Sequence, residues 1–288
     1  MRRALILAAA GAVLLAAALA GNALRHRAGL VLETRDLAGL AAMLQPGIRL
    51  VRPAGDGPHP AALLLSGCDG VHDNMDWWAG MLARGGRAAA ILDSHAPRGL
   101  DRLSSWRLVC AGQVLPGGER AGDAIAGLET LAAMPGPAPP GTLLLGASHG
   151  GWAVLEALAD LITGEVPQGV EGWQSPPRDL LAGIGGAVLL YPYCGVLNTA
   201  ARGDWHGAPP LLMILAGQDS IVSTPDCLDL AEALRARGAR ITVRVLAGAD
   251  HGFDQREKAA LSPLVFDAGL RAQAAAEVAA FLAGLPPA

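Results

Sequence analysis

The stretch Thr142-Leu-Leu-Leu-Gly-Ala-Ser148-His-Gly-Gly151 is the most informative part of this sequence. Its apolar first half predicts a buried strand, and residues 152–161 after it show a helical pattern. A G-x-S-x-G motif between a strand and a helix is typical of a nucleophile elbow, in which a sharp turn exposes the serine hydroxyl at the carboxyl edge of a sheet. In a chain with 38 glycines the motif alone is weak, and the alternative is an ordinary glycine-rich loop.

The rest of the chain alternates apolar runs with helical patterns. We expect strands at 47–52, 61–65, 87–92, 142–145, 184–191, 211–216 and 240–246. We expect helices at 77–84, 120–134, 152–161, 224–237 and 270–285, a short helix within 21–45, and an irregular insertion at 163–183. Repeated β-then-α units predict a mostly parallel central sheet with helices on both faces. In such folds functional residues lie at the carboxyl ends of the strands.

Composition and charge narrow the class of protein. The 288 residues suit one large α/β domain, although length alone would also allow two. Hydrophobic residues make up 52% of the chain, which is enough for a large core. A net charge of −4 provides no basic surface, so we do not expect nucleic acid as a partner.

The N-terminus has the features of an export signal. Arg2 and Arg3 precede an uncharged apolar run at 4–20, and Ala18-Leu19-Ala20 supplies a small-x-small cleavage pattern. We expect cleavage after Ala20. The alternative is an uncleaved membrane anchor, although the run is slightly short for a span of about 20 residues. The expected organisation is a signal peptide or anchor at 1–20, a tether at 21–46 and an α/β domain at 47–288.

The cysteine count agrees with export. Cys68, Cys110, Cys194 and Cys227 lack the close paired spacing of a zinc site, and no metal site is expected. An even number of cysteines in an exported chain predicts two disulfides, with three possible connectivities. The alternative is four buried free thiols.

Downstream of the elbow, few residues can complete a catalytic triad. A serine nucleophile needs a base, and the base needs an orienting acid, in the chain order serine, acid, histidine. His251 follows a strand and stands in a glycine-rich loop before the last helix, whereas His206 lies in an irregular loop. Asp219 directly follows the strand at 211–216. Asp250 is less favoured as the acid because consecutive side chains in an extended loop diverge. We therefore predict Asp219 and His251 as acid and base.

An oxyanion hole needs two backbone N–H groups that point at the developing charge. We expect one from His149, directly after the nucleophile, and one from the loop after strand 61–65, from Cys68 or from Asp69. The His149 ring itself is expected to pack rather than to act as a second base.

Other residues in loops at the same edge are candidates for contacting substrate. Arg98 and Asp69 are the candidate substrate-binding residues, and Arg98 could hold a substrate carboxylate through bidentate hydrogen bonds. A structural ion pair is the alternative role for Arg98. Trp173, in the insertion after the elbow helix, is a candidate lid residue.

With these motifs in place, the sequence resembles the α/β-hydrolase superfamily and, within it, the exported branch of the dienelactone hydrolase family. The motifs that support the superfamily are Gly146-Ala-Ser-His-Gly-Gly, Leu215-Ala-Gly-Gln-Asp219 and Gly248-Ala-Asp-His251-Gly-Phe. The segments that support the narrower placement are Asp93-Ser-His-Ala-Pro-Arg-Gly99 and Ser66-Gly-Cys-Asp-Gly70.

The resemblance covers about 47–285 and implies an α/β-hydrolase fold that hydrolyses small esters or lactones without a metal or other cofactor. Two departures stand out. Founding members of the family use a cysteine nucleophile, where this sequence has Ser148. The more usual His-Gly start of the oxyanion loop is Ser66-Gly67 here. Dienelactone itself is therefore not the expected substrate.

The strand order of this fold favours one disulfide connectivity. Cys68 and Cys110 follow two strands that lie side by side, so we prefer a Cys68–Cys110 bridge. Cys194 follows one strand and Cys227 lies in the first helical turn after the next, which favours a Cys194–Cys227 bridge.

The leading functional hypothesis is a serine hydrolase of small carboxylic esters, exported to the periplasm or secreted. One alternative is acyl transfer to another alcohol on the same scaffold. Another is a non-catalytic binding domain, against which an intact triad counts. If the N-terminal run is retained, the protein is membrane-anchored with its domain facing the periplasm.

Overall fold

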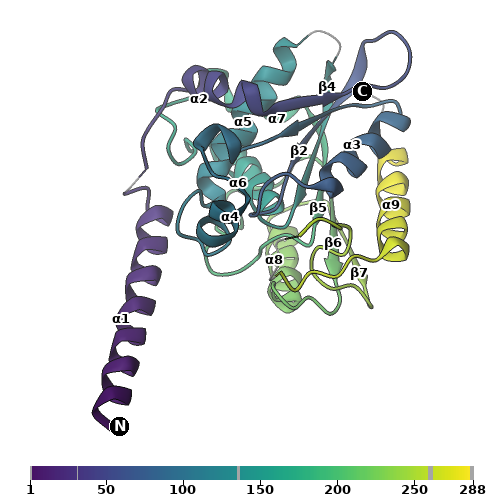
Figure 1. Cartoon of the computed structure of the whole chain (residues 1–288). Helices are drawn as coiled ribbons and strands as arrows, with labels where there is room; N and C mark the ends of the chain where they lie inside the picture. Colours follow the sequence, from purple (N-terminus) through teal and green to yellow (C-terminus); the bar gives the residue numbers. More distant parts are fainter. Residues whose placement is uncertain (1, 31, 135–136, 259–261, 286–288) are drawn as a thin grey trace.

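Seven strands form one sheet within the residues that the computed structural model describes, which are 2–30, 32–134, 137–258 and 262–285. The strand order is β1-β3-β2-β4-β5-β6-β7 (Figure 1). Their bounds are β1 (Ile48–Val51), β2 (His59–Leu65), β3 (Ala88–Leu92), β4 (Pro137–Ala147), β5 (Ile184–Leu190), β6 (Leu211–Ala216) and β7 (Ile241–Leu246). Only β1 runs antiparallel to its neighbour among these strands. The expected mostly parallel sheet is confirmed.

Helices cover both faces of the sheet (Figure 1). One face packs against α2 (Leu37–Leu44), α5 (Gly117–Ala133), α6 (His149–Thr163) and α8 (Thr224–Ala236), and the other packs against α3 (Asp73–Arg84) and α9 (Ala268–Ala283). Strand β2 shows how the sequence produces this layering. Leu63 and Leu65 belong to the first core cluster, and Ala62 and Leu64 to the second. Alternate residues of a strand point to opposite faces, so a strand buried on both faces is apolar throughout.

Short elements fill several of the connections. The loop after β3 contains η2 (Ala96–Arg98), α4 (Arg102–Ser104) and η3 (Ser105–Val109), which the sequence did not predict. The insertion after α6 contains α7 (Pro177–Ala182), and η1 (Gln45–Gly47) precedes β1.

The N-terminal boundary of the domain differs from the expected one. The expected tether at 21–46 includes α2, whose Leu37, Leu40 and Leu44 are buried in the core against α5. The domain therefore begins before residue 47. Three apolar residues at helical spacing are enough to bind this short helix to the core, because each buried leucine contributes about 1.5–3 kcal/mol.

Helix α1 (Arg2–Arg27) projects away from the domain (Figure 1). It is longer than the apolar run at 4–20, and its 22-residue stretch Leu5–His26 has a mean hydropathy of 2.1 and is not buried against the domain. A membrane-spanning helix and a signal sequence share this length and composition. Near its end, Asn22 donates to the Gln113 backbone oxygen at 2.8 Å, and Gln113 donates to the Leu19 oxygen at 3.2 Å.

Both preferred disulfides are present. Cys68 is bonded to Cys110, which ties the loop after β2 to the segment after η3. Cys194 is bonded to Cys227, which ties the loop after β5 to the first turn of α8.

Candidate active site

Ser148 occupies a strained turn between β4 and α6. Its φ of 51° and ψ of −114° are unusual for a residue with a side chain. Its N–H donates to the Leu190 oxygen at 2.8 Å, which holds the turn against the neighbouring strand. Gly150 is required because a side chain there would collide with the backbone oxygens of Leu65 and Ser66. The pattern G-x-S-x-G thus produces the predicted elbow geometry.

His251 connects Ser148 to Asp219. The His251 Nε2 atom lies 2.9 Å from Ser148 Oγ, and its Nδ1 atom lies 2.8 Å from Asp219 Oδ2. The side chains of His251 and Asp219 are only 6% and 3% exposed, so water competes little for these bonds. Because a carboxylate accepts from Nδ1, the neutral ring carries its proton there and Nε2 is left to accept the serine proton. The structure brings the three predicted residues together.

The loop after β6 fixes the acid. The Asp219 Oδ1 atom accepts hydrogen bonds from the backbone N–H groups of Ile221 and Val222, at 2.9 and 2.7 Å. The other oxygen, Oδ2, is the one that faces His251 Nδ1. This Asx-type turn fixes the direction in which the Asp219 carboxylate points.

The Asp250 carboxylate has different hydrogen-bond partners from the Asp219 carboxylate. Its Oδ1 atom accepts from the N–H groups of Ser220 and His251, both at 2.7 Å, and its Oδ2 atom accepts from the Ser220 hydroxyl at 3.1 Å. Asp250 therefore joins the loop that carries the acid to the loop that carries the base. Its carboxylate does not contact the His251 ring nitrogens.

Tyr191 packs against the His251 ring and is itself held by a buried carboxylate. The Tyr191 ring packs edge-on against it, with centroids 4.9 Å apart. The Tyr191 hydroxyl donates to the fully buried Asp254, which also accepts from the Trp78 indole N–H. Burial raises the pKa of the Asp254 carboxyl, and it raises that of the Tyr191 hydroxyl well above its usual range. Sequence pattern does not predict this support, because the Tyr191–Asp254 hydrogen bond joins residues 63 positions apart in the chain.

The opposite side of Ser148 provides free backbone donors. His149 is the first residue of α6, and Cys68 lies in the loop after β2. Across the described ranges, no oxygen accepts a hydrogen bond from either backbone N–H. A helix N-terminus also carries a partial positive charge. The geometry is therefore suited to an oxyanion hole at the two predicted positions.

A buried guanidinium joins the segments that contain these two donors. Arg120 of α5 is fully buried, and its Nη1 atom donates to the Ser66 backbone oxygen and to His149 Nδ1, both at 3.0 Å. Its Nε atom donates to the Ser94 hydroxyl at 3.3 Å. Burial lowers the pKa of Arg120 only to about 10, so it stays charged at neutral pH.

The His149 ring is held neutral. Burial and the nearby charge of Arg120 bring the pKa of His149 well below its usual value. Because Nδ1 accepts from Arg120, the ring cannot serve as a proton acceptor there, and it packs edge-on against Trp152 at 5.1 Å. This agrees with the expectation that the ring packs.

A cavity of about 210 Å³ opens beside Ser148. The residues that line it are Gly67, Cys68, Asp69, Trp106, Cys110, Ala147, Ser148, Tyr191, Ile221, His251, Gly252, Gln255, Ser262, Pro263 and Leu264. Trp106 enters the wall from η3, which the Cys68–Cys110 bridge holds beside the oxyanion loop. The predicted candidate Asp69 lies in this wall.

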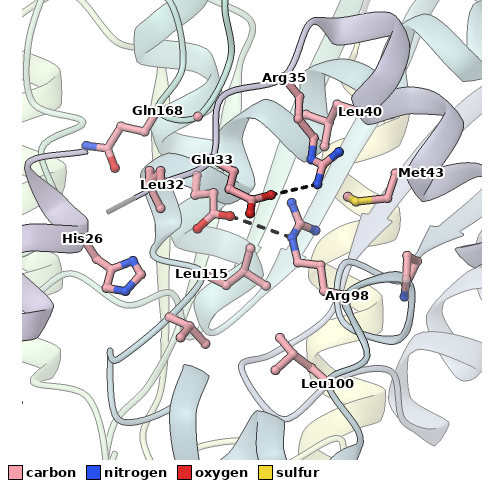
Figure 2. Close-up of a pocket in the computed structure, with 14 residues that line it drawn as sticks. His26, Leu32, Glu33, Arg35, Leu40, Met43, Arg98, Leu100, Leu115 and Gln168 are labelled. Carbon is pink, nitrogen blue, oxygen red and sulfur yellow. Dashed lines mark hydrogen bonds and ion pairs between the residues drawn. The ribbon is translucent and has the colours of Figure 1, made fainter. Parts of the chain in front are cut away.

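Arg98 lies elsewhere, which corrects its candidate role in holding a substrate carboxylate. It makes a bidentate ion pair with the buried Asp123, at 2.9 and 2.8 Å, and lines a separate cavity of about 430 Å³. Figure 2 shows Arg98 facing this space together with the Glu33–Arg35 ion pair. Arg98 is not among the described residues that line the cavity at Ser148. The alternative role, a structural ion pair, is the one observed.

Trp173 and His206 are also remote from the nucleophile. The Trp173 indole N–H donates to the Gly164 oxygen at 3.0 Å and the ring packs on the core, so Trp173 is not a lid over the cavity. His206 is exposed and pairs with Asp204. Within the described part of the chain, no group of three or more histidine, cysteine or acidic residues could hold a metal ion.

Comparison with solved structures establishes the fold. A candidate dienelactone hydrolase from Klebsiella pneumoniae subsp. pneumoniae superposes with a TM-score of 0.60 at 18% identity, over 82% of this chain and 92% of that one. The chain has the α/β-hydrolase fold. Butyrate-bound esterase 2 of Thermogutta terrifontis matches this chain with a TM-score of 0.58 at 18% identity, over 84% and 91% of the two chains. The same esterase phosphorylated by paraoxon gives 0.60 at 19% identity, over 84% and 90%.

A sequence match agrees with the structural one. Residues 178–283 match the family model described as the dienelactone hydrolase family, which confirms the expected resemblance. The matched part includes Asp219 and His251 but begins after Ser148, so the candidate nucleophile is supported by the elbow geometry alone. None of the curated proteins matches the chain in sequence. Together these findings support a carboxylic ester hydrolase.

Proposed function

We propose that the protein is a serine hydrolase of small carboxylic esters, with Ser148 as nucleophile, His251 as base and Asp219 as orienting acid. The observation that supports this most directly is the hydrogen-bonded chain from Asp219 through His251 to Ser148 at the wall of a cavity. A binding domain would have no use for a buried, correctly ordered triad on a strained turn.

In this mechanism Ser148 Oγ attacks the ester carbonyl carbon while its proton passes to His251 Nε2. Asp219 stabilises the imidazolium through Nδ1–H. The carbonyl oxygen becomes an oxyanion that accepts hydrogen bonds from the N–H groups of His149 and Cys68.

The intermediate then collapses. The bond to the leaving oxygen breaks, and His251 returns the proton to it, which releases the alcohol and leaves an acyl group on Ser148. Water gives a proton to His251 and attacks the acyl carbonyl. A second tetrahedral intermediate then releases the carboxylic acid and restores the hydroxyl of Ser148. No step needs a metal or another cofactor.

Covalent labelling tests the nucleophile. A fluorophosphonate should add one phosphonyl group to the wild-type protein, and peptide mapping should locate it on Ser148. The Ser148→Ala variant should remain unlabelled and should not hydrolyse p-nitrophenyl butyrate. Full esterase activity in a folded Ser148→Ala protein would return the chain to the binding-domain hypothesis.

We also propose that the domain functions outside the cytoplasm, with α1 removed after Ala20 or retained as an anchor. Two disulfides and a long apolar N-terminal helix support this, because such bridges persist in oxidising compartments. Intact mass of protein recovered from periplasm, medium and membranes distinguishes the two forms. Recovery only from the cytoplasm would contradict both.

A further inference from the structure

The cavity at Ser148 has a carboxylate in its wall that the proposed reaction does not use. The side chain of Asp69 is 14% exposed and lines the cavity. A methyl group built on Gly67 would lie 3.2 Å from Asp69 Oδ1 and 3.9 Å from Ser148 Cβ. The carboxylate and the nucleophile therefore border the same small space.

Asp69 is held in place by its other oxygen. The Oδ2 atom lies 2.9 Å from His72 Nε2 and accepts from Gln255 Nε2 at 3.1 Å. Within the described ranges, the other donors to this carboxylate are His72, Gln255 and the backbone N–H of Asp69 itself, so Oδ1 keeps capacity to accept a further hydrogen bond. One oxygen is thus anchored and the other remains available as an acceptor beside the reacting group.

The charge state of Asp69 follows from its neighbours. Burial would raise the pKa of this carboxyl, but the hydrogen bond and charge of His72 outweigh burial and bring the pKa below its usual value. Burial would likewise lower the pKa of His72, but Asp69 raises it above its usual value. Asp69 is ionised at neutral pH, and the imidazole that partly offsets its charge is buried and does not line the cavity.

The same cavity offers no cation to a negatively charged substrate. None of the described residues that line it is an arginine or a lysine. Arg98 is paired with Asp123 at a different cavity. A substrate carboxylate in this space would face Asp69 without a compensating charge in the wall.

We infer that Asp69 selects substrates by charge: the site accepts short esters that are neutral or that donate a hydrogen bond to Asp69 Oδ1, and rejects esters that bear a carboxylate. The inference rests on the proposed function and specifies its substrate class. A cavity of about 210 Å³ lies below the roughly 300–1,000 Å³ typical of pockets for drug-sized ligands, which favours short chains. A hydroxyl or ammonium group placed at Oδ1 would gain a charge-assisted hydrogen bond.

Two matched substrate sets measure the selection on each side of the ester. On the acyl side, p-nitrophenyl butyrate is compared with p-nitrophenyl hemisuccinate, after subtraction of the uncatalysed rate. On the alcohol side, butyrate release is compared for ethyl, 2-hydroxyethyl and carboxymethyl butyrate. Like charges about 5 Å apart in a partly buried site change a rate by on the order of 100-fold. Because His72 offsets part of this, we expect kcat/KM for the anionic member of at least one set to be about 10- to 100-fold lower.

Variants assign the selection to Asp69. Asp69→Asn should raise kcat/KM for the disfavoured anionic ester about tenfold and leave the neutral ester within about threefold. Glu257→Gln is the matched control. It removes a carboxylate that lies 3.5 Å from His72 Nδ1 and is half exposed outside the cavity wall, so it should leave the ratio unchanged.

The outcomes separate this inference from the proposed function. If Ser148→Ala has no effect on any ester, the proposed function fails. If hydrolysis depends on Ser148 but neither substrate set discriminates by more than about threefold, charge selection is wrong. It is also wrong if Asp69→Asn and Glu257→Gln change the ratio equally. The comparison of substrates on the wild-type enzyme needs no variant to fold.

Discussion

The two sides of Ser148 are built in opposite ways. On the side proposed to transfer the proton, hydrogen bonds of Asp219 and Asp250 hold His251 and the loops around it in place. On the other side lie the backbone N–H groups proposed as the oxyanion hole, and a buried arginine joins the segments that contain them. Each side contains a histidine, and the two histidines differ in the group that is hydrogen-bonded to Nδ1. A carboxylate accepts from His251 Nδ1, whereas burial and the charge of Arg120 hold the pKa of His149 well below its usual value.

The largest expected effect is on the proton-transfer side. Ser148→Ala and His251→Ala should each lower kcat by roughly 10⁵-fold or more, and the double variant should lose little beyond either single one, because the triad acts as a unit. Steady-state kinetics with p-nitrophenyl butyrate, alongside thermal unfolding to show that the variants fold, measures this. Additive losses would indicate that the two side chains act independently.

The acid should matter somewhat less. Asp219→Asn keeps the shape of the loop but no longer enforces the tautomer with a proton on Nδ1, so kcat should fall on the order of 10⁴-fold. The substitution leaves the backbone donors to Oδ1 satisfied, and the melting temperature should change little. A loss of activity caused only by unfolding would instead appear as a large drop in melting temperature.

Arg120→Met tests the oxyanion side. Removing the guanidinium frees the Ser66 oxygen and His149 Nδ1, so the two donor segments lose their common partner. Loss of alignment in an oxyanion hole acts on the transition state, and we expect kcat to fall roughly 10- to 100-fold with KM nearly unchanged. Arg120→Lys should restore part of kcat by supplying a charge at the same place.

Arg98→Met is the matched control for Arg120→Met. It removes a guanidinium that is partly buried, and it takes the ion-pair partner from Asp123 without removing a contact to Ser66 or His149. Breaking a buried pair costs about 3–5 kcal/mol of unfolding free energy. We expect Arg98→Met to lower the denaturation midpoint in urea while the folded fraction keeps its kcat. If both variants lose kcat equally, Arg120 acts only through stability.

The sequence predicts the proton-transfer side of the site better than the oxyanion side. Ser148, Asp219 and the loop of His251 each follow a buried apolar run, so strand periodicity and chain order place them at one edge. Arg120 lies in a helical pattern, where a charged residue is ordinarily assigned to the solvent face. Its neighbours Gly117, Gly118 and Gly122 were the available signal, because a run of small residues lets other segments approach the helix closely.

The walls of the cavity were harder still to predict. Trp106 comes from a loop whose short helical turns leave no periodic signal, and it reaches the cavity because a disulfide places that loop. The position of Arg98 after a strand predicts a place at the site, but its guanidinium pairs with a buried carboxylate on α5. Pairing with Asp123 depends on the packing of a helix against a loop, which spacing along the chain does not encode.

The smallest expected effect distinguishes the two neighbouring acids on the proton-transfer side. Among the described residues, the Asp250 carboxylate accepts hydrogen bonds from two backbone N–H groups and from the Ser220 hydroxyl. Asp250→Asn therefore keeps an oxygen that can accept from the N–H groups of Ser220 and His251 and removes the charge. Activity should fall less than about tenfold, since the substitution shifts the base loop without altering the tautomer of His251. Kinetics of Asp219→Asn and Asp250→Asn, measured side by side, decide the assignment. Equal losses would mean that both aspartates orient His251 in solution. The assignment of this role to Asp219 alone, in the loop after β6, would then be wrong.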